Sequence, residues 1–346
     1  MTLFGRALRE HRLELDSINV FPVADGDTGT NLLATYERVE GALAAGEGDG
    51  NLDDLATTIA RASLVGARGN SGVILSLALR GLCEGLSAAE TPDGLAFAAG
   101  LRRASDDAWG AVGRPVEGTI LSVLRDAARA AGRAAEGGAG LADVVDQALD
   151  EARSSLARTT DLLPELRAAG VVDAGAKGIV LLLDALRAAL GDRQLSEPVG
   201  PSGPVGRTRG PSVAPPDRAF EVQVLLEAPP RPIPGLRARL AEIGSSVVVV
   251  GAGGLFNVHV HTDEPARAAD EVAKAGRALE THVADLRVAV AACAAAPARE
   301  VRPAGEACGL LVVTGGEGLA RAFASLGARV IGSAAAAPEP SAVAAV

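Results

Sequence analysis

The 346-residue chain exceeds the usual length of one domain, so we expect two or three. Its formal net charge of −10, without any basic tract, argues against nucleic-acid binding, because affinity for a phosphate backbone comes mainly from clustered Lys and Arg. Three widely spaced cysteines, a charged N-terminus and the lack of a window apolar enough for a membrane span predict a cytoplasmic protein without signal peptide or transmembrane segment.

The first candidate site is the stretch DGDTGTN at 25–31, which directly precedes a helical run. Asp25 and Asp27 flank a glycine that lets the chain turn, so their carboxylates can bridge hard cations such as Mg²⁺. Thr28, Thr30 and Asn31 follow at the helix N-terminus, where N–H groups and the helix dipole favour phosphate oxygens. An ordinary Asp-Gly turn with a helix cap would use the same residue types, but the flanking NVFPV and GTN favour a metal and phosphate site.

Apolar residues recur at helical spacing from Asn31 to about Leu190, which predicts an all-α domain. Its glycine-rich turns at 66–72, 113–119 and 171–178 suggest a shared site at one end of a bundle, since glycine lets backbone N–H groups approach a ligand closely. The first of these turns is not a Walker A loop, and an ordinary turn between helices would look similar. The second could equally be a helix cap. The candidate nucleotide contacts on these two turns are Gly66, Gly69, Asn70, Ser71, Gly72, Glu117 and Thr119.

A Pro/Gly-rich stretch at 193–217 predicts an extended linker. The pattern after it is strand, helix, strand, strand, helix, strand, which is typical of a small α+β, ferredoxin-like domain at 218–292. Its fourth strand is expected in ETHVADLRVAV. His259 and His261 alternate with valines, so both imidazoles should lie on one face of a strand, either as half of a zinc site or as ordinary exposed polar residues.

The last segment, 293–346, contains a strand, a glycine turn, a helix and another strand. A unit of this size buries too little surface to be stable alone. We therefore expect it to be the start of an α/β domain whose remainder is missing from the sequence.

Six ordered blocks resemble the ATP-binding subunit of two-component fatty acid kinases, whose N-terminal domain is similar to the nucleotide-binding, DhaL-like domain of dihydroxyacetone kinases. The blocks are INVFPVADGDTGTN (18–31), LVGARGNSGVILS (64–76), RPVEGTILSV (114–123), ELRAAGVVDAGAKGIVLL (165–182), SVVVVGAGGLFNVHVHTDEP (246–265) and TGGEGLARAFASLGARVI (314–331). The resemblance implies a multidomain chain: an all-α DhaL-like helical barrel at 1–192, the linker, the middle domain, and a partial DegV-like domain at 293–346.

The resemblance also implies that the barrel holds ATP and two Mg²⁺ ions. The metal ligands would be Asp25 and Asp27, which are also the catalytic candidates, with Asn19 or Asn31 as a further contact. Asn19, or more remotely Asp16, stands where the dihydroxyacetone kinase relatives have an aspartate, so the third ligand stays open. The segment containing Asp173, Gly175 and Gly178 would help to close the nucleotide pocket.

In the middle domain the family is expected to carry a zinc-like site that uses a cysteine on the first strand with the two histidines. Glu221 stands about where that cysteine would be. Glu221, His259 and His261 are therefore candidate ligands of a second-domain metal such as Zn²⁺, with His282 as a candidate fourth ligand.

The implied activity is transfer of the γ-phosphoryl group of ATP to a fatty acid carried by a separate DegV-like lipid-binding protein, giving an acyl phosphate. A carboxylate is already nucleophilic at neutral pH, so no general base is required. The alternatives are a dihydroxyacetone kinase-like phosphotransferase and a nucleotide-binding regulator or scaffold without catalysis. We also expect a homodimer.

Overall fold

The computed structural model describes residues 2–48, 50–191, 216–295, 311–313 and 329–331. The chain forms two compact units, and the larger one contains every described residue up to 295. Nearly all of the expected linker and most of the expected third domain lie outside the described residues. Among those described, no helix combines the length and apolarity that a bilayer crossing requires.

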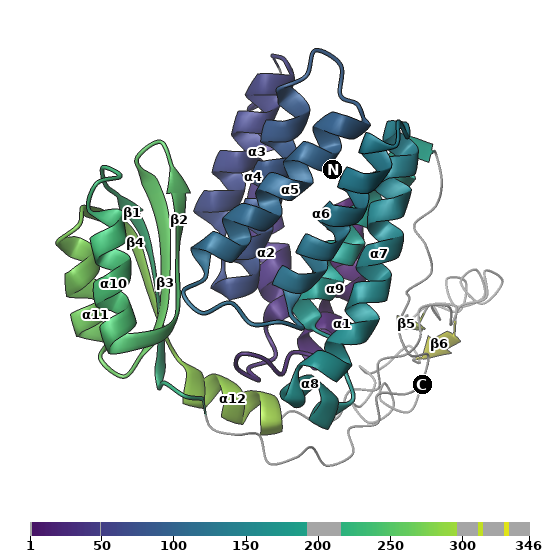
Figure 1. Ribbon diagram of the computed structural model, residues 1–346. Helices are drawn as coiled ribbons and strands as arrows, with labels where there is room; N and C mark the ends of the chain where they lie inside the picture. The colour runs from purple at the N-terminus through teal and green to yellow at the C-terminus, as the bar shows by residue number, and fades with distance from the viewer. Residues whose placement is uncertain (1, 49, 192–215, 296–310, 314–328, 332–346) are drawn as a thin grey trace. The chain divides into compact units, whose positions relative to one another are not determined.

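The N-terminal domain consists of helices that pack in sequence around a ring (Figure 1). From α1 to α8 each helix packs against the next, and α9 packs against both α7 and α1, which closes the ring. This agrees with the predicted all-α domain. The helices are α1 (Thr2–Ser17), α2 (Thr28–Ala44), α3 (Leu52–Gly66), α4 (Gly69–Ser87), α5 (Gly94–Ala111), α6 (Ile120–Glu136), α7 (Leu141–Leu162), the short α8 (Pro164–Ala169) and α9 (Ala174–Gly191).

Small residues allow the helices to approach closely, as the low aromatic content requires. At the crossing of α4 and α5, a methyl group on Gly81 would lie 2.6 Å from the backbone nitrogen of Ala104. Gly85 and Gly100 meet in the same way. The core between the helices is built mainly from Leu, Ala and Val side chains, and Tyr36, its largest fully buried side chain, is in edge-to-face contact with Phe4.

The second domain of this unit is a four-stranded antiparallel sheet in the order β2-β3-β1-β4, and its first six elements follow the predicted order. The predicted fourth strand is too long, because the chain leaves the sheet at Asp285 and enters a helix. The Asp285 carboxylate accepts hydrogen bonds from the backbone N–H groups of Arg287 (2.9 Å) and Val288 (3.4 Å), which caps that helix. The elements are β1 (Phe220–Glu227), α10 (Ile233–Ile243), β2 (Gly244–Ala252), β3 (Leu255–Thr262), α11 (Pro265–Ala273), β4 (Arg277–Asp285) and α12 (Leu286–Ala295).

The two faces of this sheet contact different layers (Figure 1). Helices α10 and α11 cover one face, where Val258 and Val260 belong to the sheet's own core. The other face lies against the barrel, and Val248 and Val250 belong to the barrel's core. The edge strand β2 also pairs with the segment before α6, because Gly113 N–H donates to the carbonyl oxygen of Val247 at 3.1 Å. The sheet therefore docks on the barrel through both side chains and backbone.

The smaller unit contributes two described strands, β5 (Leu311–Val313) and β6 (Arg329–Ile331), which pair in parallel. Parallel strands are what the predicted strand–helix–strand segment requires. The predicted intervening helix lies outside the described residues.

Candidate nucleotide and metal site

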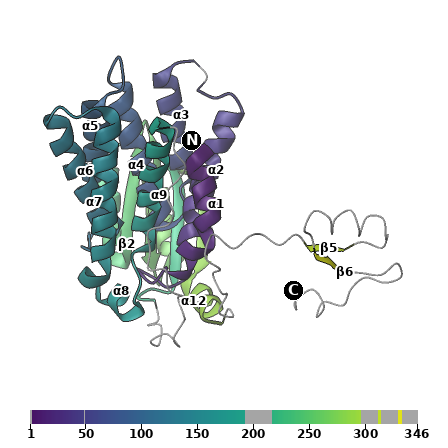
Figure 2. The ribbon, with the colours of Figure 1, turned by 90° about the vertical axis from the view of Figure 1, so that its right-hand side faces the viewer.

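The barrel brings the N-termini of α2, α4, α6 and α9 to one end, which Figure 2 shows from the side. A methyl group on Gly69, at the start of α4, would lie 2.5 Å from the Asn31 side chain of α2. One on Gly175 of α9 would lie 3.4 Å from Ile120 of α6. Gly178 approaches Leu32 of α2. The glycine-rich turns thus converge as their composition predicted, and their helices direct first-turn N–H groups toward the same end.

The DGD turn depends on its central glycine. Gly26 has φ = +71°, a conformation that L side chains rarely adopt. A methyl group there would also lie 2.7 Å from Sγ of Cys293, which α12 places against the turn. Asp25 and Asp27 are consequently presented on either side of a tight bend.

Asn19 braces this turn. Its side-chain oxygen accepts hydrogen bonds from the backbone N–H groups of Asp27 (3.0 Å) and Thr28 (3.2 Å), and its amide donates to the carbonyl of Val23 (3.0 Å). Asn19 is only 6% exposed. Because its oxygen is already engaged by two donors, we assign Asn19 to shaping the loop and do not retain it as a metal ligand.

Asp16 holds the next residues in a similar way. Its carboxylate accepts from both the backbone N–H and the hydroxyl of Thr30, each at 2.9 Å. Asp16 therefore caps the start of α2 from outside the helix, and the Thr30 hydroxyl is directed at Asp16. The Asn31 side chain hydrogen-bonds to Asp27 instead.

The electrostatics of Asp25 and Asp27 are those of an uncompensated acidic pair. Burial, and then the negative charges of Asp27 and Glu221, raise the pKa of Asp25. Burial and Glu221 likewise raise the pKa of Asp27, while the hydrogen bond from Asn31 opposes the shift. A divalent cation between such carboxylates would remove the repulsion, and carboxylate oxygens are the ligands that Mg²⁺ prefers.

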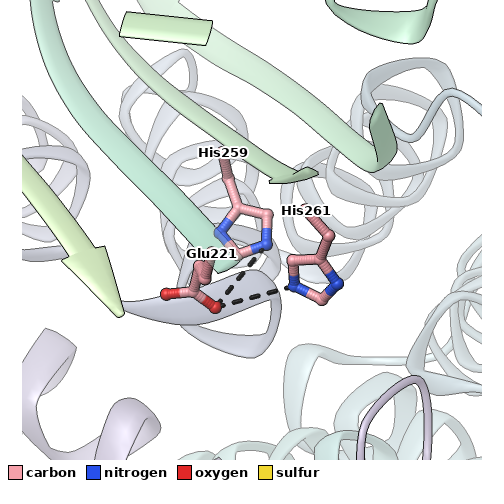
Figure 3. Close-up of side chains that lie close together, drawn as sticks. All are labelled: Glu221, His259 and His261. Carbon is pink, nitrogen blue, oxygen red and sulfur yellow. Dashed lines mark ion pairs between the residues drawn. The ribbon is translucent and has the colours of Figure 1, made fainter. Parts of the chain in front are cut away.

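Glu221 belongs to the second cluster, which Figure 3 shows on β1 and β3. Glu221 Oε2 lies 3.9 Å from His259 Nε2 and 3.7 Å from His261 Nε2, and one ligand atom from each residue falls within 4.8 Å of the others. His259 is 0% and His261 3% exposed. Within the described part of the chain, neither ring nitrogen of His259 has a hydrogen-bond partner, nor does Nδ1 of His261. Buried imidazoles without partners fit a metal site better than the alternative of exposed polar residues.

The protonation of this cluster also suits a metal. Burial lowers the pKa of His259 to about 4, so its ring is neutral and offers a lone pair at neutral pH. Burial alone would raise the pKa of Glu221, but the neighbouring histidines, His259 first, lower it to about 2. His282 acts on Glu221 only through its charge, and its exposed side chain on β4 lies outside the three-residue cluster.

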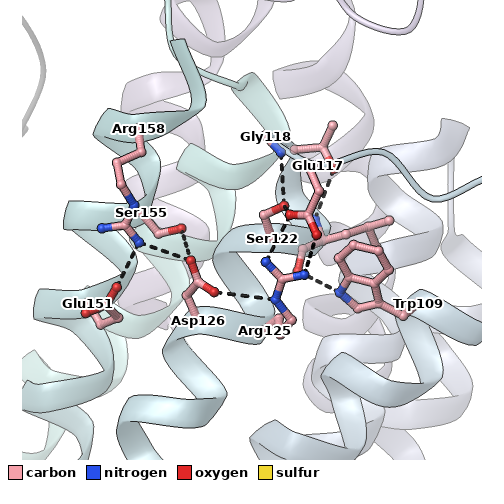
Figure 4. Close-up of polar contacts among 11 residues, drawn as sticks. Trp109, Glu117, Gly118, Ser122, Arg125, Asp126, Glu151, Ser155 and Arg158 are labelled. Carbon is pink, nitrogen blue, oxygen red and sulfur yellow. Dashed lines mark hydrogen bonds and ion pairs between the residues drawn. The ribbon is translucent and has the colours of Figure 1, made fainter. Parts of the chain in front are cut away.

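Glu117 is engaged in a polar network on α6 and α7 (Figure 4). Its carboxylate receives two bonds from Arg125 (2.5 and 2.9 Å) and one from Ser122 (2.6 Å). Thr119 caps α6 by accepting from Leu121 N–H at 3.4 Å. Thr119 therefore matches the capping alternative, whereas Glu117, among the described residues, bonds only to the side chains of Arg125 and Ser122 and stabilises the turn that precedes α6.

Asp173 links two helices. Its carboxylate accepts from the N–H of Ala176 at 2.8 Å, which caps α9, and from the backbone of Ile120 at the start of α6. Burial raises its pKa to about 6. Asp173 thus holds the N-terminal ends of α6 and α9 together, and Gly175 allows their close approach.

Sequence reasoning did not single out Gln223 and Asn257, which reach from the sheet to the α3–α4 turn. The alternation of side chains between the two faces of a strand could have identified them. Both residues have the strand parity of Glu221, His259 and His261, so they share one polar face of the sheet.

Two family models match the chain. Residues 22–188 match the DAK2 domain, and residues 217–292 match the FakA-like middle domain of fatty acid kinase proteins. The chain therefore carries a DAK2 domain followed by a FakA-like middle domain.

The chain is also similar to longer proteins. The chain is 33% identical to protein YloV of Bacillus subtilis over 94% of its own length and 62% of that protein. It is 34% identical to an uncharacterised protein of Staphylococcus saprophyticus, covering 75% of this chain and 49% of that one. The chain thus spans about half to three fifths of these relatives.

Among solved structures, the chain is similar to the dihydroxyacetone kinase from C. freundii in complex with AMP-PNP and Mg²⁺. The TM-score is 0.41 and the identity 22%, with 54% of this chain and 32% of that chain covered.

Proposed function

We propose that this chain is an ATP-dependent kinase subunit that transfers the γ-phosphoryl group to a fatty acid carried by a separate, DegV-like lipid-binding protein. One observation carries the proposal: the acidic pair Asp25 and Asp27 stands at the N-terminus of α2, beside the N-terminus of α4. Two carboxylates and two sets of helix N–H groups are complementary to metal-bound phosphates.

The residues present fit Mg²⁺. Asp25 and Asp27 supply hard oxygen ligands, and their pKa values are raised first by burial and then by neighbouring negative charge, both of which a bound cation would offset. The bound ions would neutralise phosphate charge and align the γ-phosphate with its acceptor. Asn70 and Ser71 would contact phosphate oxygens through first-turn N–H groups of α4, and the side-chain oxygen of Asn70 is buried without a partner among the described residues.

The acceptor chemistry agrees with the side chains available. A fatty acid carboxylate is ionised at neutral pH and needs no general base, so the protein's task is to position phosphate and acceptor. We further propose that Glu221, His259 and His261 bind Zn²⁺. The charge of Glu221 acts on both aspartates, which supports a place for this cluster next to the phosphates.

Further proposals rest on the same two domain matches. The middle domain is ferredoxin-like, which the strand order β2-β3-β1-β4 supports. The functional divisions are 1–192, 193–217, 218–292 and a partial DegV-like domain at 293–346. The protein acts in the cytoplasm as a homodimer.

The test is to mix the purified chain with Mg-ATP and a fatty-acid-loaded DegV-like protein, and to trap acyl phosphate with hydroxylamine as the hydroxamate. Hydroxamate should form with the native chain and not with Asp27→Asn, while a change at an exposed position of α5, Asp106→Asn, should have no effect. Phosphorylation of dihydroxyacetone without any acyl hydroxamate would overturn the proposed acceptor. Mg-ATP binding without turnover on either acceptor would indicate a regulator instead.

A further inference from the structure

Two buried amides join the sheet to the turn that leads into α4. The Gln223 amide group donates to the carbonyl of Ala67 (2.5 Å) and to the side-chain oxygen of Asn257 (2.9 Å), while its oxygen accepts from Gly69 N–H (3.2 Å). Asn257 donates to the carbonyls of Leu64 (3.3 Å) and Ala67 (3.4 Å). Gln223 is 4% and Asn257 2% exposed. Every one of these bonds except the one between the two amides crosses from one domain to the other.

The opposite side of the turn is held by α2. The Thr35 hydroxyl accepts from Arg68 N–H at 3.1 Å and donates to the carbonyl of Asn31 at 2.7 Å. Gly69 itself has φ = +56°, with the Asn31 side chain occupying the space that a methyl group would need. The turn is therefore set between Thr35 of the barrel and the amide pair of the sheet.

The hydrogen bonds of the Gln223 and Asn257 amides contribute more to the specificity of the interface between sheet and barrel than to its strength. Apolar contacts of Val248 and Val250 already attach the sheet to the barrel. A buried amide costs free energy unless its groups are hydrogen-bonded, so an interface that needed only adhesion would be served by apolar residues. Gln223 and Asn257 instead meet the particular donors and acceptors of the residue 64–69 segment.

We propose that Gln223 and Asn257 are positioning residues: the middle domain uses them to set the α3–α4 turn in the conformation that binds phosphate. By accepting the hydrogen bond from Gly69 N–H, Gln223 holds the first turn of α4 in place, so that the N–H groups of Asn70 and Ser71 point to the nucleotide. This inference rests on the proposed nucleotide-binding function.

The register of the sheet also relates the two amides to the metal cluster. Gln223 lies two residues from Glu221 on β1, and Asn257 lies two residues from His259 on β3, all with the same strand parity. One rigid face of the sheet thus carries the metal cluster at one place and the clamp on the phosphate turn at another. The amide pair thereby fixes the distance between the cluster and the nucleotide.

The experiment uses the full chain with Gln223→Ala, Gln223→Glu and Asn257→Ala. The glutamate variant keeps the acceptor for Gly69 N–H but loses both donors, so it reports on the amide donors without leaving a cavity. The control is Arg237→Ala, because Arg237 also joins the domains, through the carbonyl of Gly110 at 3.0 Å, but does not touch the turn. Mg-AMP-PNP affinity is measured by calorimetry, and exchange of the 64–72 amides by mass spectrometry.

Each Gln223 or Asn257 variant should weaken Mg-AMP-PNP binding by roughly tenfold and speed exchange at 64–72 by a similar factor, with exchange in α7 unchanged. Arg237→Ala should change neither. Native nucleotide affinity and native exchange in the Gln223 variants would overturn the proposal, as would an equal effect of Arg237→Ala. If the native chain did not bind Mg-AMP-PNP but the variants still exchanged faster at 64–72, the proposed function would be refuted. The role of Gln223 and Asn257 in holding the turn would still stand.

Discussion

Glu221 of β1 and Asp25 of the DGD turn come from different domains, yet the charge of Glu221 contributes to raising the pKa of Asp25. The acids of the two candidate metal sites therefore form one electrostatic unit. A cation bound at either site should ease the negative charge felt at the other.

Replacing Asp25 or Asp27 by Asn should lower Mg²⁺-dependent ATP affinity by roughly a hundredfold, because each change removes a charged ligand oxygen. The same change should raise the unfolding temperature without metal, since it removes one of two carboxylates that repel each other. Calorimetry with and without Mg²⁺ measures both effects. An unchanged affinity in both variants would rule out this metal assignment.

The raised pKa values of Asp25 and Asp27 should make the free energy of unfolding depend on pH. Its pKa values in the folded chain are raised above the ordinary carboxyl value of 3.8, so the folded state binds protons more tightly than the unfolded state. This stabilisation is complete below the unfolded pKa and is lost as pH rises through the raised values. Urea unfolding at several pH values should show Asp25→Asn gaining stability over the native chain as pH rises. A constant difference between the two proteins would contradict the shifts.

Gly26→Ala should distort the DGD turn, because it combines a positive φ with a clash against Cys293. We expect a loss of about 1–3 kcal/mol in unfolding free energy and loss of Mg-ATP binding. Gly138→Ala is the matched control, since Gly138 has φ = +81° but no atom of the described residues within 4 Å of the added methyl group. Adding Cys293→Ala to Gly26→Ala should recover part of the loss. Equal behaviour of the two alanine variants would show that the contact with Cys293 does not matter.

Zinc should bind the native chain and be lost in His259→Ala, while His282→Ala retains it because His282 lies outside the cluster. Since the pKa of His259 is lowered to about 4, protons compete for this ligand only at low pH. Glu221→Cys should tighten binding, because a thiolate is a softer ligand for Zn²⁺ than a carboxylate. Metal analysis after dialysis and competition with a chromophoric chelator measure these affinities. Retention of zinc by His259→Ala would place the metal elsewhere.

Features encoded in a few neighbouring residues were predictable. The alternation of His259 and His261 with valines predicted which side chains share a face of β3. The valines do lie on the other face, in the core between the sheet and its own helices. The glycine-rich turns likewise predicted convergence at one end of the helical domain. Local backbone preferences determine both features.

Features that depend on distant partners were not predictable. Glu117 lies in a glycine-rich turn of the kind that binds phosphate, but its carboxylate accepts hydrogen bonds from Arg125 and Ser122. No spacing rule reveals that pairing. Asn19 looked like a displaced metal ligand because sequence cannot show that two N–H groups already use its oxygen. Gln223 binds a turn far from it along the chain, and only the docked sheet makes that contact.

The placement of Val248 in the barrel's core has a consequence for cooperativity. Separating the sheet from the helices would expose this valine together with the barrel surface that covers it, so each part loses buried area when the other unfolds. The barrel and the sheet domain should consequently melt in one calorimetric transition, with the domain boundary marking a change of architecture inside a single thermodynamic unit.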